Sequence, residues 1–442
     1  MMRIEASFRR ALYALRGGFL LRPLIIALTL GSCGALFSEI EERIPVVRRF
    51  VPSLLFPSQS DPQVAQAILT TIATSTMTVV SIVFAILLMT LTLASTQFSP
   101  RILVSFVRDR VTQWTLGVFL GTFSYCLAAL PAARNLPQPF SPVATTTGAM
   151  ALAPICVGWL IYFIHHISDS ISVNNIVDRI GRETERVIDE LMSQPRPPFA
   201  SMEVAGTFPG PLDLALPNGK SGYIRYVDID RLRAIAKSYG VSARLMRRVG
   251  HFVPEGVEIL RLSRGDRITS ERALELLSAI DIGPTRTLQQ DIEFGVVQIV
   301  DIALKALSPA INDPTTAISC VDQLTSIIIR WISRVPPRSC YYDPPHVLRV
   351  LIPWIKLDGL LDLAFAQIGH YGAADAAVSL RLMRALGDIA GATDDFATRA
   401  TLAKRGRDIL AGCDGRLMAG DMARLRERLS ALERKANENV FG

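Results

Sequence analysis

The sequence predicts a mainly α-helical membrane protein, in which four transmembrane helices are followed by a cytoplasmic α+β domain with a small β module and a helical C-terminal part. Three observations predict this class. All four long apolar stretches lie within the first 170 residues. Those residues contain 12 Lys/Arg and 7 Asp/Glu, whereas the rest of the 442-residue chain contains 35 and 33. Beyond them, apolar side chains recur at helical and strand spacing among charged ones, which is typical of a fold in water.

Each apolar stretch is long enough to cross a bilayer. A hydrocarbon core about 30 Å thick requires about 20 apolar residues in a helix. The stretches that meet this length are residues 19–38, 64–97, 113–133 and 143–167. We therefore assign residues 1–170 to a transmembrane domain. We expect the first span to be an uncleaved signal anchor, because three further spans follow it.

The distribution of basic residues predicts the orientation. Eight Lys/Arg lie in the N-terminal segment and in the 98–112 loop, against four in the two opposite loops. Cytoplasmic loops of membrane proteins carry the excess of Lys/Arg. We therefore expect a multi-pass protein of the bacterial inner (plasma) membrane, with both the N- and the C-terminus in the cytoplasm.

The second span has an unusual composition. Its 34 residues carry no formal charge, and as one helix it would be about 51 Å long, so it must tilt, kink or project beyond the bilayer. Thr70, Thr74 and Thr78 follow at i, i+4 spacing, and Ser81 continues the stripe. Two interpretations stay open. Small hydroxyl residues allow close helix packing, or they line a water-filled path and replace part of an ion's hydration shell.

The polar part of the chain divides into three segments. Residues 171–198 predict an amphipathic stalk helix that continues the fourth span, followed by a proline-rich linker. Residues 199–262 predict a small β-rich module, because GYIRYVDI and VSARLMRRV are typical of strands. Residues 263–442 predict a helical domain. Its helices are expected at about 269–280, 291–307, 314–333, 345–369, 374–391, 394–412 and 417–437.

The most distinctive segment of the helical domain is ALSPAINDPTTAISCVDQL, residues 306–324. Pro309 should end one helix, because proline interrupts the helical hydrogen bonds. Asp313 should cap the next helix, with Pro314 at its first position. The segment therefore predicts a tight corner between two helices.

This corner is also a candidate ligand site. Its polar residues are Ser308, Asn312, Asp313 and Thr315. Helix N-termini near the turn could hold an anion. Asp291, Asp301 and Asp313 could hold a cation if the fold gathers them. Both ligand readings stand beside the simpler interpretation of a capped turn.

Several classes of function are disfavoured. The net charge of +7 comes mainly from the first 170 residues, and the remainder is nearly balanced, so we expect no nucleic-acid partner. The six cysteines and five histidines show no spacing of a disulfide framework or zinc site. The sequence contains no nucleotide-binding, hydrolase or EF-hand motif. A proton-coupled transporter usually requires a charged residue deep in a span. No span of this sequence contains one. We expect no enzymatic activity, no cofactor and no metal.

Three segments carry a family resemblance. They are LTLASTQFSPRIL (residues 91–103), GYIRYVDIDRL with GHFVPEG, and DIEFGVVQIVDIALKALSPAINDPTTA (residues 291–317). Together they resemble the bacterial family of predicted membrane proteins catalogued as domain of unknown function 2254. Relatives typically read S-P-G-I-N-D-P where this chain has Ala310. The resemblance implies a multispan N-terminal membrane region and a soluble C-terminal region, and it implies no activity.

We interpret the chain first as a homo-oligomeric ion channel or pore-type transport protein with a cytoplasmic regulatory domain. In that interpretation the second span lines the path. The alternative is a membrane-anchored sensor or scaffold that binds a ligand or protein partner through its cytoplasmic domain. The expected partners are the lipid bilayer, further copies of the chain, and an ion or small-molecule ligand.

Overall fold

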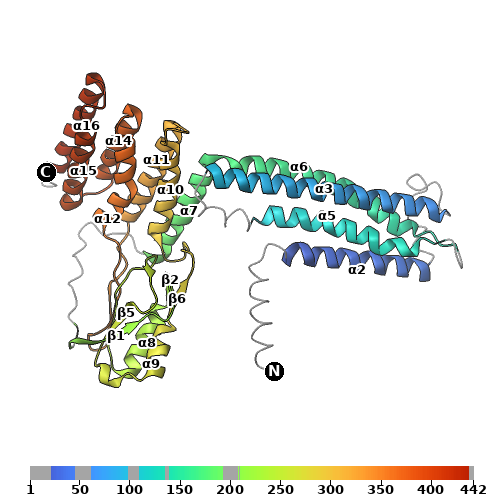
Figure 1. Cartoon of the computed structure of the whole chain (residues 1–442), viewed down its shortest axis with the longest axis horizontal. Helices are drawn as coiled ribbons and strands as arrows, with labels where there is room; N and C mark the ends of the chain where they lie inside the picture. The colour runs from blue at the N-terminus through green and yellow to red at the C-terminus, as the bar shows by residue number, and fades with distance from the viewer. Residues whose placement is uncertain are drawn as a thin grey trace. The chain divides into compact units, whose positions relative to one another are not determined.

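The computed structural model describes residues 21–44, 61–97, 109–134, 139–192, 208 and 210–437. The chain forms two compact units, Met1–Ser172 and Val173–Gly442. We call them the apolar unit and the α+β unit, and Figure 1 shows the elements of each. Four of the five N-terminal arginines (at 3, 9, 10 and 16), the arginines at 101 and 108 and the proline-rich linker lie outside the described residues.

The described part of the apolar unit is built from four long helices that lie side by side (Figure 1). They are α2 (Leu21–Arg43), α3 (Pro62–Gln97), α5 (Arg110–Ala129) and α6 (Val143–Ile171), with a 3-10 turn η3 (Leu130–Ala132) after α5. All four are long and apolar enough to cross a membrane, which confirms the predicted apolar helices. Helix α5 is central: half of its most apolar stretch is buried, against 11% for α3.

Glycines allow α2 and α5 to approach closely. A Cβ atom on Gly34 of α2 would lie 2.5 Å from the carbonyl oxygen of Tyr125, and one on Gly117 of α5 would lie 2.5 Å from Cδ1 of Ile26. Both distances are shorter than real carbon contacts. Small residues at a helix interface permit this backbone approach, which maximises dispersion contacts between apolar helices.

A buried carboxylate joins α2 to α6. Glu41, near the end of α2, is 1% exposed. Its oxygens accept hydrogen bonds from the backbone N–H groups of Ala144 (2.8 Å) and Thr145 (2.9 Å) and from the Thr145 hydroxyl (2.9 Å). These N–H groups belong to the first turn of α6, where no carbonyl of the same helix can accept them. Glu41 therefore caps a helix other than its own, and its charge opposes the positive end of that helix.

Contacts at both ends show that helices consecutive in the chain run antiparallel, whereas α2 and α5 run parallel. Close to Glu41, Gln66 at the start of α3 donates to the carbonyl of Ala133 after α5 (2.5 Å). At the opposite end, Asp109 caps α5 and lies 3.1 Å from Nε2 of His166 near the end of α6. The C-terminal ends of α2 and α5 thus lie beside the N-terminal ends of α3 and α6.

Helix α7 (Val173–Leu191) begins the α+β unit. The expected uninterrupted helix from the fourth span is wrong, because α6 ends at Ile171 and Ser172 has an extended backbone (φ −60°, ψ 124°). Nor is α7 a free-standing stalk. It packs against α10 (Ile292–Ala306) and α11 (Pro314–Ile332), and Asp189 pairs with Arg330 at 2.6 Å. The break lets the apolar face of α7 be buried in this helical layer.

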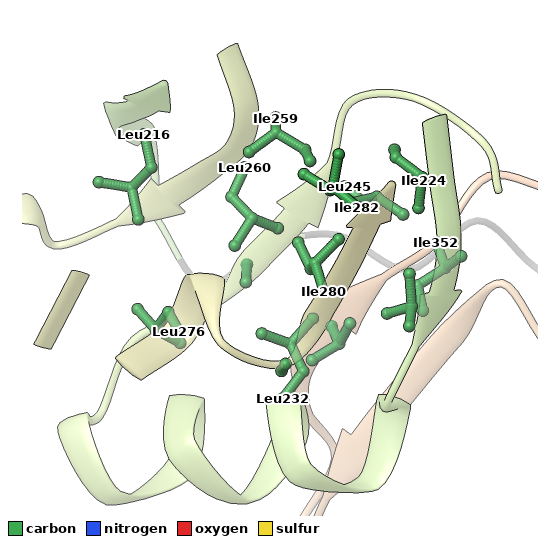
Figure 2. Close-up of a cluster of buried hydrophobic side chains, with 14 of the residues drawn as sticks. Leu216, Ile224, Leu232, Leu245, Ile259, Leu260, Leu276, Ile280, Ile282 and Ile352 are labelled. Carbon is green, nitrogen blue, oxygen red and sulfur yellow. The ribbon is translucent and has the colours of Figure 1, made fainter. Parts of the chain in front are cut away.

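Two small sheets follow in the α+β unit. Their orders are β1-β5-β3-β8-β7 and β4-β2-β6, and within the first sheet β3 and β8 are parallel. The strands are β1 (Leu212–Pro217), β2 (Gly222–Val227), β3 (Ala243–Leu245), β4 (Phe252–Val253), β5 (Glu258–Ser263), β6 (Ile280–Gly283), β7 (Cys340–Asp343) and β8 (Val347–Leu351). Helices α8 (Ile229–Tyr239) and α9 (Ser270–Leu277) and a 3-10 turn η4 (Gly265–Arg267) lie between strands in the chain. Both sheets and α8 and α9 share one core, in which Ile224, Leu232 and Leu260 are fully buried (Figure 2).

The β-rich part extends beyond the expected residues 199–262. Strand β6 follows α9, and the hairpin β7–β8 occupies residues 340–351, where the start of a helix over 345–369 was expected. Leu348, Val350 and Ile352 alternate along the chain and are buried. This is the two-residue period of a strand, so the helical expectation was wrong for this segment.

The remaining elements are helical, close to the predicted positions. They are α12 (Leu357–Leu361), a π-helical turn η5 (Asp362–Ala366), α13 (Gln367–Tyr371), α14 (Ala376–Gly391), α15 (Phe396–Gly412) and α16 (Ala419–Asn437). Helix α14 packs against α11, α15 and α16. The irregular stretch from α12 to α13 contacts α10, α14 and α15.

The capping role of Glu41 predicts a loss of stability on its removal. Glu41→Ala leaves two N–H groups of α6 without acceptors, which should destabilise the apolar unit by about 2 kcal/mol. Thermal unfolding of the full chain in detergent micelles, followed by circular dichroism, measures this loss. Glu39→Ala is the matched control, since Glu39 pairs with exposed Arg43 of its own helix and its removal should change stability by less than about 0.5 kcal/mol. Equal effects of the two changes would contradict the capping role.

Candidate functional site

The hydroxyl stripe predicted in the second span lies on the surface of the apolar unit. Thr70, Thr74, Thr78 and Ser81 are all exposed on α3. They line a groove of about 440 Å³ between α3 and α5. Phe123 and Leu127 contribute to the α5 side of this groove. The four residues are therefore not buried against other helices of their own chain.

Two hydroxyls of this stripe donate hydrogen bonds within α3. Thr78 donates to the carbonyl oxygen of Thr74 (2.9 Å), and Ser81 donates to that of Met77 (3.2 Å). Such bonds within a helix satisfy the donor in an apolar medium. A hydroxyl oxygen that donates its proton still has lone pairs to accept with. Because these residues line the groove, the groove offers acceptors without charge.

Part of the exposed surface of α3 lies outside the groove. Ser75 and Ile82 are exposed but do not line it. The walls of the groove contain no charged side chain among the described residues. The groove is thus a neutral surface, with hydroxyls along one helix and apolar side chains along the other.

A second set of polar residues, which the sequence interpretation did not single out, is buried between α5 and α6. Tyr125 donates to the carbonyl of Thr145 (3.0 Å), and the Thr122 hydroxyl lies 3.2 Å from Sγ of Cys156. Further along, Trp159 donates to the hydroxyl of Thr115 (2.9 Å). On α5, steps of seven and three residues separate Thr115, Thr122 and Tyr125. This helical spacing is the sequence signal that could have revealed the buried polar set. These contacts join the two helices, and Thr115, Thr122 and Tyr125 do not line the groove on α3.

The predicted corner is a capped turn. Asp313 accepts from the backbone N–H (3.1 Å) and the hydroxyl (2.6 Å) of Thr316, and these hydrogen bonds hold the pKa of its carboxyl below the ordinary value. Asn312 has a positive φ of 49°. Ser308 donates to the carbonyl of Lys305 (2.7 Å), and Thr315 is exposed. The polar side chains thus stabilise the turn between α10 and α11.

The three carboxylates proposed for a cation do not converge. Asp291 caps the beginning of α10, whereas Asp313 follows the end of the same helix. A helix of 15 residues is roughly 22 Å long. In the described part of the chain, no group of three His, Cys, Asp or Glu side chains is placed to hold a metal ion.

Asp291 instead forms a buried ion pair with Arg286. Its side chain is 1% exposed, and its two oxygens accept from Nε and Nη2 of Arg286, both at 2.8 Å. Gly250 makes room for it: a Cβ there would lie 2.2 Å from an Asp291 oxygen, and its φ of +87° also favours glycine. Two of the segments that carry the family resemblance, GHFVPEG and DIEFGVV, therefore meet at this ion pair.

A neighbouring pair continues this polar junction. Arg248 donates from Nη2 to Glu293 (3.2 Å). Burial raises the pKa of the Glu293 carboxyl, and the positive charge of Arg248 opposes that shift. Gln290 forms two hydrogen bonds with the backbone of Val227 in β2. The junction thus attaches the sheets to the start of α10.

Four helices of membrane-spanning length and composition, followed by a polar α+β unit, define a predicted membrane protein with a large polar portion. The family described as Predicted membrane protein (DUF2254) matches residues 16–388, and the chain belongs to this family. The resemblance inferred from the sequence is confirmed.

Mycobacterial relatives are also similar to this chain. Uncharacterized protein Rv1290c of Mycobacterium tuberculosis (strain H37Rv) and Uncharacterized protein Mb1321c of Mycobacterium bovis are each 34% identical to it over 373 residues. The match covers 83% of this chain and 70% of each relative. No solved structure matches the chain.

The buried ion pair predicts a large effect of removing one partner. Arg286→Met leaves the Asp291 carboxylate buried without its cation, which should destabilise the α+β unit by about 3 to 5 kcal/mol. Thermal unfolding of the full chain in detergent measures the loss. Arg233→Met, which removes a mostly exposed pair with Asp230, should cost less than about 1 kcal/mol. Adding Asp291→Asn to Arg286→Met should restore part of the stability, and a further loss would argue against the buried charge as the cause.

Proposed function

We propose that this protein is a homo-oligomeric, pore-type transport protein of the bacterial inner membrane. In this proposal α3 of each copy lines the path, and the α+β unit lies in the cytoplasm and regulates it. The observation that carries the proposal is the exposure of Thr70, Thr74, Thr78 and Ser81 along one groove of the apolar unit.

Exposure of the stripe bears on the two interpretations of its hydroxyls. Close packing within the chain would bury these residues against α2, α5 or α6, and they are exposed. A stripe facing lipid would gain nothing from its hydroxyl groups, because lipid tails supply no hydrogen-bond partners. Neighbouring copies arranged with α3 toward a common axis would instead place the acceptor oxygens around a hydrated path.

The composition of the groove favours a weakly selective path. No charged side chain lines it among the described residues, so it lacks the rings of charge that select strongly between cations and anions. Hydroxyl oxygens replace only part of a hydration shell. We expect passage of small ions or small uncharged solutes that keep part of their water.

The orientation rests on loop charge and on the alternation of the helices. Consecutive helices alternate in direction, so the start of α2, the end of α3, the start of α5 and the end of α6 share one side. In the sequence, the N-terminal segment adjoins the start of α2, and the 98–112 loop joins α3 to α5. These two segments hold eight Lys/Arg against four in the opposite loops. The positive-inside rule then supports a cytoplasmic position for the α+β unit.

Cysteine accessibility tests the proposed path. In a Cys33→Ala, Cys126→Ala background, Thr74→Cys or Thr78→Cys should react with a membrane-impermeant thiosulfonate, and the reaction should reduce solute flux into liposomes at least severalfold. Ile82→Cys is the matched control: Ile82 is 52% exposed on α3 but lies outside the groove. It should stay unreactive at the same depth.

Two results would overturn the proposal. One is the absence of flux of K⁺, Na⁺, Cl⁻ and glycerol through reconstituted protein at every voltage and membrane tension applied. The other is equal reaction at Thr74→Cys and Ile82→Cys. If the protein is folded and gives either result, the alternative of a membrane-anchored sensor or scaffold takes precedence.

A further inference from the structure

The α+β unit contains a partly open cavity that the proposed path does not use. It has a volume of about 220 Å³ and lies among α12, η5, α13, α14 and α15. Its inner wall is apolar: Leu361, Phe365 and Leu386 are at most 5% exposed. Taking about 30 Å³ for each water molecule, the space corresponds to about seven waters.

An irregular helix shapes one wall of this cavity. Residues Asp362–Ala366 form a π-helical turn between two α-helical segments. A π-helix bonds residues five apart and widens the turn, and such turns occur often at functional sites. Leu361, Phe365 and Gly369, four residues apart, all line the cavity. Residues spaced by four lie on the same face of a helix, which explains why all three line the cavity.

The rim of the cavity carries an excess of negative charge. Asp362 and Asp408 line it together with one guanidinium, that of Arg405. Arg405 donates from Nη1 to Asp362 (2.6 Å) and from Nη2 to Asp358 (2.8 Å). One cation therefore serves two carboxylates, and in the described part of the chain Asp408 forms no ion pair.

The glycine at the centre of the wall leaves open space. A Cβ atom on Gly369 would lie 3.8 Å from Ile409 and from Leu382, which is ordinary van der Waals contact. A larger side chain is thus not excluded by a clash at Cβ. His370, also on the rim, is exposed.

We propose that this cavity binds a small amphipathic amine, with an apolar body of about six to nine heavy atoms. The body would pack against Leu361, Phe365 and Leu386, and the ammonium group would lie at the rim between Asp362 and Asp408. An apolar wall with few charged groups at the mouth is typical of small-molecule sites. Two carboxylates against one guanidinium leave the rim with a net negative charge, which favours a cation over a neutral or anionic ligand.

This binding is independent of whether α3 lines a path. The test therefore measures binding itself: 2-phenylethylamine is titrated into the purified full chain in detergent by isothermal calorimetry. Its neutral isostere 2-phenylethanol and the anion 3-phenylpropionate are titrated in parallel. The amine should bind at least tenfold more tightly than either, and empty micelles give the background.

Variants assign the binding to this cavity. Asp408→Asn should weaken amine binding at least fivefold, whereas Asp414→Asn, an equal charge change at an exposed residue outside the cavity, should not. Gly369→Leu fills the space and should abolish binding, while Gly369→Ala should weaken it less. Equal affinity for amine and alcohol, or unchanged amine binding in both folded Asp408→Asn and Gly369→Leu, would overturn the proposal.

Discussion

Carboxylates at helix N-termini hold together elements that lie far apart in the sequence. The first turn of a helix has N–H groups with no acceptor in its own helix. Asp291 caps α10 and also accepts hydrogen bonds from Nε and Nη2 of Arg286. One side chain therefore connects the helical layer to the sheets. Glu41 does the equivalent in the apolar unit, where it caps α6 from α2. Each satisfies polar groups that would be costly to bury alone.

The two sets of hydroxyls in the apolar unit have different environments. Between α5 and α6, Thr115 and Thr122 contact polar partners across the interface. On α3, Thr78 and Ser81 donate to carbonyls of their own helix and line the groove. Helix α5, although less apolar than α3, is therefore the enclosed one. Composition alone would have assigned the opposite order of burial.

Local signals in the sequence account for the features that were predicted correctly. Apolar length defines a span, and Asp-Pro defines the start of α11, because both depend on adjacent residues. The hairpin β7–β8 was missed because its strands are short and β8 pairs with β3, about a hundred residues earlier. The meeting of Gly250 with Asp291 was equally hidden, since spacing along the chain does not place two loops together. The groove on α3 was anticipated only as a stripe, because its α5 wall depends on helix packing.

The parallel pairing of β3 with β8 has a consequence for synthesis of the protein. The chain leaves the sheet, forms α10 and α11, returns to add β8 and β7, and then leaves again to complete the helical layer. The sheet layer is therefore discontinuous in sequence and cannot be completed until residues beyond 351 have emerged from the ribosome. Long-range pairing of this kind slows folding. Meanwhile β3 presents an unpaired edge, which is a site for mispairing with other nascent chains.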